Sequence, residues 1–463
     1  MSGVEERVLD RSVPPPAAEL TPFRFPAFEH HRLPNGLQVY LARRSPAPLV
    51  QIDLVTAAGA HFDPPGAAGL ATLTAALIDE GTEGRSALEI AGEVERLGGY
   101  LGTSADWDAT YLSTSLLSHH VVAGLSLLAE LATSPSFPTH EIERLRRLRL
   151  AELRRRLSQP ATLAADALAR VIYRDTVFAS PLSGTRQSVE AISSDDIRGF
   201  YRRYFGPEGS AVIAVGRLDP ELLLSHVEAV LGAWDGAPQP QPAAIDPAPL
   251  TGLQVEIIDR PNSVQTELRL GHVGVPRGHR DYVPLQVMNA LFGGKFTSRI
   301  NLNLRERHGF TYGAQSRFAA RLGPGPFVVS TSVATEFTGR AVEETQKELA
   351  RLLEEPVSQE EVEDTKNYLL GTFPYTLQRI DGLARRLEVL AIHSLPDDYY
   401  DIYLQAIRGV DVAQVGQLAR RHLHPDRMAI VTVGPAETLE KQLCRFGPVS
   451  VREVGDPAAE ASP

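Results

Sequence analysis

One module is written twice in this chain of 463 residues, and the duplication constrains the fold more than any other feature. The motif VQIDL at 50–54 returns as VQTEL at 264–268, and RRYFGPEGSAVIAVG at 202–216 matches RRHLHPDRMAIVTVG at 420–434. Matching motifs are separated by a nearly constant ~200 residues, which is far longer than the period of a solenoid repeat. The simplest explanation is two copies of one fold in a single chain.

The order of expected elements is similar in both copies. In the first copy, alternating apolar residues predict strands at 37–42 and 50–57, followed by a helix, more strands, long helices and a strand that ends at Gly216. Strands and helices mixed in this way predict an α+β fold, in which helices pack on a mainly antiparallel sheet. The chain should therefore form two homologous lobes of this kind.

The two copies are joined by a proline-rich segment, 235–250, whose five prolines favour an extended and rather stiff linker. This linker divides the chain into two lobes with an end segment on each side. The expected parts are an N-terminal extension 1–24, a first lobe 25–234, the linker, a second lobe 251–446 and a C-terminal tail 447–463.

Composition narrows the classes of partner. The 46 lysines and arginines against 57 aspartates and glutamates give a net charge of −11 without a basic patch, which argues against nucleic acid as a partner. The single cysteine, Cys444, excludes an internal disulfide framework and fits a reducing compartment. No stretch approaches the ~20 apolar residues of a membrane span, and the first residues do not resemble a secretory signal. We expect a soluble cytoplasmic protein, or a periplasmic one if a leader was removed.

The segment GLATLTAALIDEGT, 69–82, predicts a helix with one inert side. Its leucines recur at the spacing that buries one face of a helix, whereas Thr72, Ala75 and Ala76 offer little chemistry. Together with LPNGLQVYL at 33–41, this segment resembles the pitrilysin or insulysin (insulinase-like) type of zinc metallopeptidase, in the two-lobed, half-clam form of the mitochondrial processing peptidase subunits. The resemblance covers roughly 25–445, nearly the whole chain.

In active members of that family, the early helix carries His-x-x-Glu-His, whose histidines hold zinc and whose glutamate is the general base. The resemblance places this motif on Thr72, Ala75 and Ala76, so that both ligands and the base are missing. A third ligand falls on Glu152, which is retained, and a second family carboxylate falls on Leu145. Glu152 alone cannot hold zinc, because a catalytic site needs about three protein ligands; the residue is better explained as a surface or helix-paired carboxylate.

Other histidines do not replace the missing ligands. His61 lies in a turn before the helix, and His140 with Glu141 has no second histidine in reach. His422 and His424, at i and i+2 on a predicted helix, should point away from each other. The sequence therefore predicts no metal site in this chain and, by resemblance, zinc on a partner.

The second copy contains Gly293, Gly294 and Lys295, which are similar to the end of a phosphate-binding loop, but Phe296 follows where Ser or Thr is needed. The glycines are better explained as a tight turn into a helix at 297–308. Gly309 then suits the position after the helix, where a positive φ is often required, and a strand should begin at 310.

An arginine and a tyrosine seven residues apart, Arg305 and Tyr312, match the family pair that faces the zinc across the substrate cleft. The resemblance implies that the guanidinium binds peptide carbonyls and that the phenol donates to the oxyanion. The alternative is a helix-surface arginine and a half-buried strand tyrosine.

Three functions follow from these patterns. The first is a non-catalytic, substrate-binding subunit of a heteromeric zinc metallopeptidase, paired with a homologous chain that carries His-x-x-Glu-His and acts on unfolded peptides. The second is a structural subunit without a proteolytic role, similar to the core proteins of the respiratory bc1 complex. A self-sufficient zinc peptidase is the third, and the empty helix argues most strongly against it.

Overall fold

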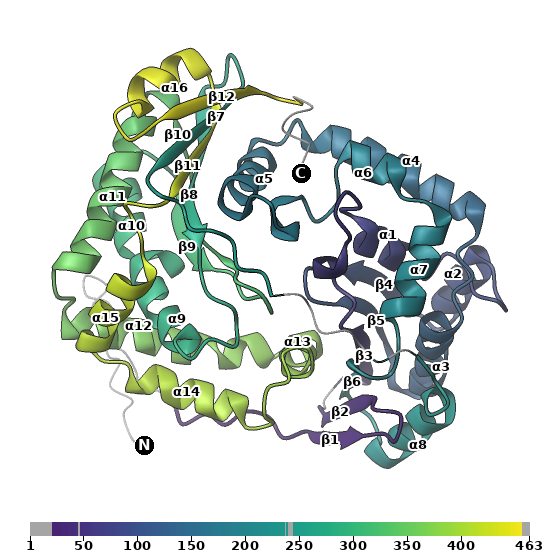
Figure 1. Ribbon diagram of the computed structural model, residues 1–463. Helices are drawn as coiled ribbons and strands as arrows, with labels where there is room; N and C mark the ends of the chain where they lie inside the picture. The colour runs from purple at the N-terminus through teal and green to yellow at the C-terminus, as the bar shows by residue number, and fades with distance from the viewer. Residues whose placement is uncertain (1–20, 45–46, 237, 239–243, 456–463) are drawn as a thin grey trace, which may run out of the picture.

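The computed structural model describes residues 21–44, 47–236, 238 and 244–455. It consists of two lobes, each built on a six-stranded sheet (Figure 1). The strand order is β1-β2-β6-β3-β5-β4 in the first sheet and β12-β7-β11-β8-β10-β9 in the second. Apart from the edge strands β1 and β12, strands at equivalent positions come in the same chain order in the two halves. The predicted α+β fold with two homologous, mainly antiparallel lobes is confirmed.

The strands of the first sheet are β1 (Glu29–Arg32), β2 (Gln38–Arg43), β3 (Leu49–Thr56), β4 (Tyr100–Ala105), β5 (Thr110–Leu117) and β6 (Ser210–Gly216). Those of the second are β7 (Gln254–Asp259), β8 (Gln265–Val273), β9 (Ala314–Phe318), β10 (Pro326–Ala334), β11 (Ala429–Gly434) and β12 (Val449–Glu453). The strands predicted at 37–42 and 50–57 are β2 and β3, each displaced by one residue. Parallel pairing occurs between β2 and β6 and between β7 and its neighbours β11 and β12.

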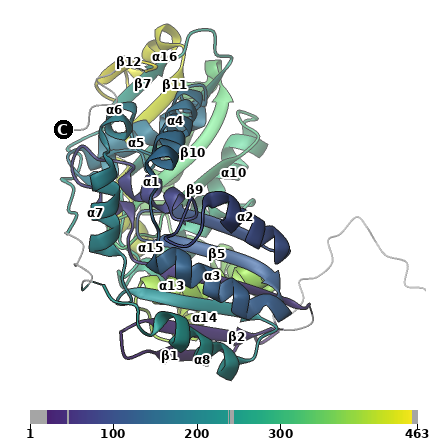
Figure 2. The same cartoon turned by 90° about the vertical axis from the view of Figure 1, so that its right-hand side faces the viewer.

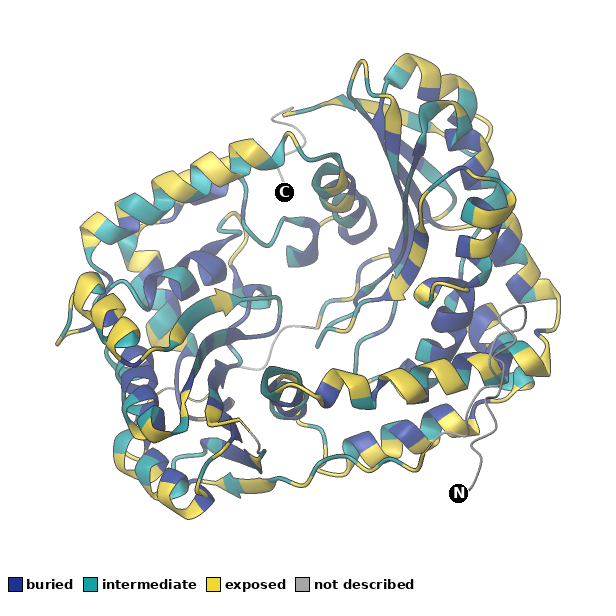
Figure 3. Ribbon diagram, turned by 180° about the vertical axis from the view of Figure 1, so that it is seen from behind, coloured by how far each residue is buried: buried dark blue, intermediate teal, exposed yellow. Residues whose placement is uncertain are grey.

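The duplicated motifs form the centre of each sheet. The two glycine-ended motifs become β6 and β11, which are buried along their whole length (Figure 3). Both faces of these strands are covered, which explains why their sequences are continuously apolar instead of alternating.

The outermost strands differ between the lobes. β1 comes from the N-terminal part and pairs antiparallel with β2, whereas β12 comes from the C-terminal part and pairs parallel with β7. Part of the expected tail at 447–463 therefore belongs to the second sheet, because the backbone of Val449–Glu453 completes the ladder beside β7. Residues 456–463, the extension at 1–20 and the linker residues 237 and 239–243, which include two of its five prolines, lie outside the described residues.

The helices of the first half are α1 (Leu70–Leu77), α2 (Ala87–Arg96), α3 (Val121–Thr133), α4 (Thr139–Arg156), α5 (Pro160–Tyr173), α6 (Arg186–Ala191), α7 (Ser194–Tyr204) and α8 (Pro220–Leu231). Those of the second half are α9 (Tyr282–Asn289), α10 (Arg299–Asn301), α11 (Thr338–Glu354), α12 (Gln359–Thr372), α13 (Ile380–Ile392), α14 (Tyr399–Gly409), α15 (Val412–His422) and α16 (Ala436–Leu443). None of these helices, within the part of the chain that is described, combines the length and apolar character that a bilayer crossing requires.

Each half of the chain lends one helix to the other half. In the first sheet, α3 packs on one face and α13, from the second half, packs on the other against β3 and β6 (Figures 1 and 2). Reciprocally, α5 from the first half packs on β8 and β11 of the second sheet. The packing therefore does not follow the division of the sequence into lobes at 25–234 and 251–446. The helices α5 and α13 each pack against the sheet of the opposite lobe.

A pair of carboxyl groups lies where α13 meets the first sheet. Asp53 of β3 is buried and accepts a hydrogen bond from Nε2 of Gln51 at 2.6 Å. Burial raises the pKa of Asp53, and burial together with the Asp53 carboxyl raises the pKa of Glu388 in α13. The two side chains are hydrogen-bonded to each other, which requires a proton on one of the carboxyl groups, so their titrations are coupled.

Glu388→Gln should weaken the pH dependence of stability. The pKa of Glu388 is higher in the folded chain than in the unfolded chain, so the stability that its proton supplies is present below the unfolded pKa and is lost as the pH rises toward the folded value. Glutamine keeps a donor for Asp53 without titrating. Urea unfolding at about pH 5 and about pH 8 should show a smaller loss in the variant than in the wild type. Glu360→Gln, at an exposed position of α12, is the control, and an unchanged loss in Glu388→Gln would contradict the coupled titration.

Candidate functional site

The helix on which the resemblance places the zinc motif is α1. The carboxylate of Asp63 accepts the backbone N–H groups of Gly69 and Ala71, both at 2.8 Å, and thereby caps the first turn. Gly69 has a φ of +93°, which an L side chain rarely adopts. The predicted leucine face is buried in the core of the first lobe.

The guanidinium of Arg149 contacts Thr72, which stands at the first position of the missing motif. Nη1 of Arg149, in α4, donates to Oγ1 of Thr72 at 3.0 Å and lies 3.3 Å from the backbone oxygen of Ser183. The Thr72 hydroxyl in turn donates to the backbone oxygens of Gly69 and Leu182. The Arg149 side chain is only 16% exposed, so a largely buried cation lies beside Thr72.

Glu152 lies one helical turn after Arg149, and their Oε2 and Nε atoms are 4.0 Å apart. Leu145, one turn before Arg149, packs against the core of the first lobe. Ala75 and Ala76 add no polar side chain. These residues do not fit a zinc ion, because the imidazole ligands are missing and a fixed positive charge lies beside the one carboxylate.

Sequence reasoning missed Arg149. Its signal was present, since a residue three before Glu152 shares its face of a helix. The arginine was hidden in the arginine-rich run of 144–156, where most side chains are typical of a solvated surface.

Rebuilding the zinc motif should require the removal of Arg149. The triple variant Thr72→His, Ala75→Glu, Ala76→His should bind zinc weakly, and adding Arg149→Ala should raise the affinity at least about tenfold, because the competing cation is gone. Zinc titration against a competing chelator measures the difference. Arg147→Ala, at an exposed position of α4, is the matched control in the triple background. Equal affinities of the two quadruple variants would show that Arg149 does not oppose the metal.

In the second lobe, the helix predicted at 297–308 is present as α10 followed by a π-helical turn, Leu302–Arg307. Gly309 has the expected positive φ, at +64°. The strand begins at Ala314 and not at 310, because the intervening residues form a loop.

The glycines before this helix serve packing. Gly293 and Gly294 end a π-helical segment, Ala290–Gly294, and do not form a tight turn into the next helix. A Cβ at Gly293 would lie 2.4 Å from Oγ of Ser316 in β9, so glycine allows the close approach of this segment to the sheet.

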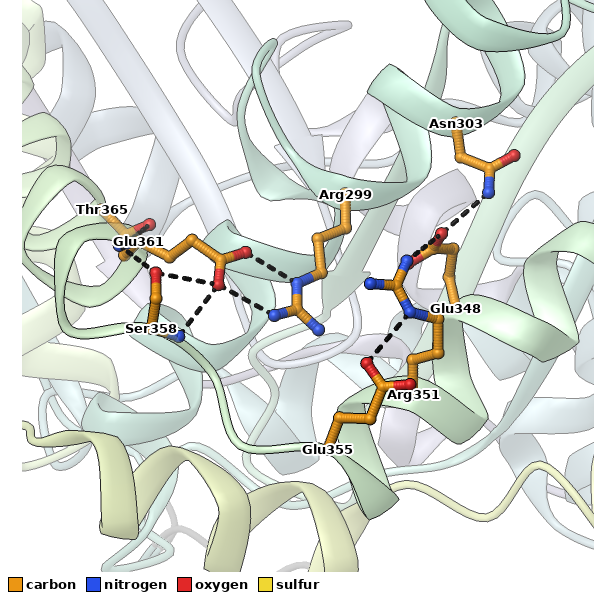
Figure 4. A network of polar contacts seen from close by, with 8 residues as sticks. All are labelled: Arg299, Asn303, Glu348, Arg351, Glu355, Ser358, Glu361 and Thr365. Atoms are coloured by element: carbon orange, nitrogen blue, oxygen red, sulfur yellow. Dashed lines mark hydrogen bonds and ion pairs between the residues drawn. The ribbon is translucent and has the colours of Figure 1, made fainter.

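The helix that carries Arg305 is anchored at two points (Figure 4). Arg299 makes two hydrogen bonds to Glu361 of α12, at 2.8 and 2.9 Å, and holds the pKa of that carboxyl at about 2. Asn303 donates to Glu348 of α11 at 2.8 Å. Both anchors fix the backbone from which Arg305 projects.

Tyr312 lines a groove in the second lobe, and Arg305 stacks on another residue that lines it. The guanidinium of Arg305 lies over the ring of Phe296, 4.5 Å from its centroid, and Phe296 and Tyr312 both line a groove of about 560 Å³ beside β9. Tyr312 is 93% exposed in the loop before β9, which excludes the alternative of a half-buried strand tyrosine. An arginine donor and a phenol hydroxyl are thus available next to an aromatic wall that includes Tyr368.

The edge of β9 itself is closed by two asparagines. The backbone N–H of Ala314 donates to Oδ1 of Asn301 at 3.0 Å, and Nδ2 of Asn289 donates to the backbone oxygen of Ser316 at 3.0 Å. These bonds satisfy backbone groups that an added strand would use.

The first-lobe helix of this duplicated α+β chain lacks metal-ligating side chains, and the second lobe has an open aromatic groove. These features define a two-lobed metallopeptidase homologue whose residues do not fit the catalytic metal at the usual place. Residues 38–186 match the sequence profile of the insulinase family, peptidase family M16, and residues 191–369 match that of the peptidase M16 inactive domain. The chain belongs to peptidase family M16.

Relatives and solved structures cover nearly the whole chain. A Bacillus subtilis protein named uncharacterized zinc protease YmxG is 21% identical over 87% of this chain and 97% of its own. A Helicobacter pylori protein named non-peptidase homolog YmxG is 22% identical over 85% of this chain and 88% of its own. The crystal structure of a peptidase M16 inactive domain from Pseudomonas fluorescens is 27% identical, covers 88% of this chain and 98% of that chain, and has a TM-score of 0.81.

Proposed function

We propose that this chain is the non-catalytic, substrate-binding subunit of a heteromeric zinc metallopeptidase. One observation carries the proposal: the guanidinium of Arg149 lies beside Thr72, where the family motif begins, whereas Tyr312 lines an open groove and Arg305 stacks on Phe296 at that groove. A chain of this kind can bind a peptide but cannot activate water by itself. The name of the Pseudomonas relative, an M16 inactive domain, supports a role without catalysis of its own.

The partner in this proposal is a homologous chain that carries His-x-x-Glu-His, and the substrate is an unfolded peptide. Arg305 would donate to peptide carbonyls and the Tyr312 hydroxyl to the oxyanion formed at the partner's metal, where preorganised donors lower the barrier. The compartment that we propose is the cytoplasm, to which the single, exposed Cys444 is suited.

Reconstitution tests this proposal. The purified chain and a homologue from the same organism with an intact His-x-x-Glu-His motif are assayed separately and together on an unstructured peptide. We expect chelator-sensitive cleavage by the mixture, far above that of either chain alone. Cleavage by this chain alone would contradict the proposal.

A structural role is the second candidate, favoured by the name of the Helicobacter relative, a non-peptidase homolog. It predicts a stable complex with the homologous chain, detected by size-exclusion chromatography, in which cleavage stays at the level of the homologue alone.

A further inference from the structure

A second group of possible metal ligands lies in the second lobe, away from α1 (Figure 1). His279 and Asp281 precede α9, and His422 is the last residue of α15. One ligand atom of each side chain lies within 4.8 Å of the other two. Two imidazoles and one carboxylate are a ligand set that Zn²⁺, Co²⁺, Ni²⁺ and Fe²⁺ accept, whereas Ca²⁺ and Mg²⁺ prefer oxygen ligands alone.

Hydrogen bonds hold these three side chains in place. Nε2 of His422 lies 2.8 Å from Oδ2 of Asp281, and the backbone N–H of Asp281 donates to Nδ1 of His279 at 3.1 Å. The side chains of His422 and Asp281 are only 9% and 14% exposed. Because the ligands are already positioned, little ordering entropy opposes the binding of an ion.

The sequence analysis placed His422 and His424 on one helix, pointing away from each other. This expectation was wrong, because α15 ends at His422 and the next residue, Leu423, is extended. Residues at i and i+2 along an extended backbone point to the same side. The ring of His424 consequently lies 5.1 Å from that of His272, which is buried and whose Nε2 has no hydrogen-bond partner among the described residues. Four imidazoles therefore gather around the end of α15.

We propose that His279, Asp281 and His422 form a binding site for a divalent transition-metal ion. The ion takes the place of the proton between His422 and Asp281, and His279 completes a three-residue set that leaves further coordination positions for water. The bound metal joins the segment before α9 to the C-terminal end of α15. The three residues lie outside the groove that Tyr312 lines, so the site does not depend on the proposed peptidase function.

Two arginines compete with the ion. Nη1 of Arg421 donates to Oδ2 of Asp281 at 3.0 Å, and Nε of Arg280 lies 3.7 Å from Oδ1. Their side chains are largely exposed and can turn to solvent, but their charges lower the affinity for a cation. The arrangement therefore predicts opposite effects for neighbouring residues: loss of His422 weakens binding, and loss of the Arg421 charge strengthens it.

Titration with Co²⁺ tests the site, because ligand-field absorption bands report the coordination directly. The wild-type chain should bind one equivalent. His279→Ala and His422→Ala should each lower the affinity by about a hundredfold, and Arg421→Gln should raise it severalfold at low salt. The double variant His119→Ala, His120→Ala removes a pair of neighbouring histidines in the first lobe and should leave binding unchanged.

Unaltered Co²⁺ binding in His279→Ala, or an absence of binding in the correctly folded wild type, would overturn the site. Circular dichroism identifies variants that fail to fold, and Arg421→Gln tests the site without removing a ligand. The result is separable from the proposed function, since Co²⁺ binding is read spectroscopically and reconstitution is read as cleavage. For the same reason, rebuilding of the zinc motif on α1 is best measured in a His279→Ala background.

Discussion

Tyr312→Phe should lower kcat of the reconstituted peptidase by about a hundredfold or more, because removal of one oxyanion donor costs a factor of this size. The ring remains to line the groove, so that only the hydroxyl is lost. Since Tyr312 is almost fully exposed, the substitution should leave the stability of the chain unchanged. The measurement is steady-state cleavage of an unstructured peptide by the chain mixed with its zinc-bearing homologue.

Tyr375→Phe is the matched control, because Tyr375 is also strongly exposed and lies outside the groove. Arg305→Ala separates binding from catalysis: a donor to peptide carbonyls in the ground state should raise KM more than it lowers kcat. Arg307→Ala, two residues along the same π-helical turn, controls for loss of positive charge. Full activity of Tyr312→Phe and Arg305→Ala in the mixture would remove the role assigned to this groove.

Features that depend on local patterns could be predicted from the sequence. Alternation predicted β2 and β3 within one residue, and the position of Gly309 after a helix predicted its positive φ. The duplication predicted two equivalent sheets, because matching apolar motifs fold into matching central strands. In each case the cause lies within a few residues or in a comparison of the two copies.

Features that depend on distant contacts could not be predicted. The apolar faces in the sequences of α5 and α13 indicate that each helix packs against another element. They do not indicate which of the two sheets that element is. The meeting of Arg149 with Thr72, or of His279 with His422, joins residues that are far apart along the chain. His424 was also misplaced, because the end of α15 at His422 was not recognised.

Leu387→Ala should destabilise the first lobe, although residue 387 belongs to the second half of the chain. Leu387, in α13, is completely buried in a cluster that contains Tyr40, Ile213 and Val215 of the first sheet. Truncation of a buried leucine costs about 2–5 kcal/mol, from lost burial and the cavity left behind. Of the two tryptophans of the chain, Trp234 belongs to the core of the first lobe, so its fluorescence during urea unfolding reports that lobe, whereas Trp107 also contacts Arg321 of the second half.

Ile402→Ala, at a half-exposed position of α14, is the control and should change the free energy of unfolding by less than about 0.5 kcal/mol. A tryptophan transition that stays in place in Leu387→Ala would show that the lobes unfold independently.

A shifted transition has a consequence for function. Separating the lobes would remove α13 from β3 and β6, and α5 from β8 and β11. The exchanged helices, and not the linker at 235–250, therefore set the distance between α1 and the Tyr312 groove. In the proposed heteromeric peptidase, peptide entry would then depend on movement between the two subunits, because opening this chain would expose the surfaces that α5 and α13 cover.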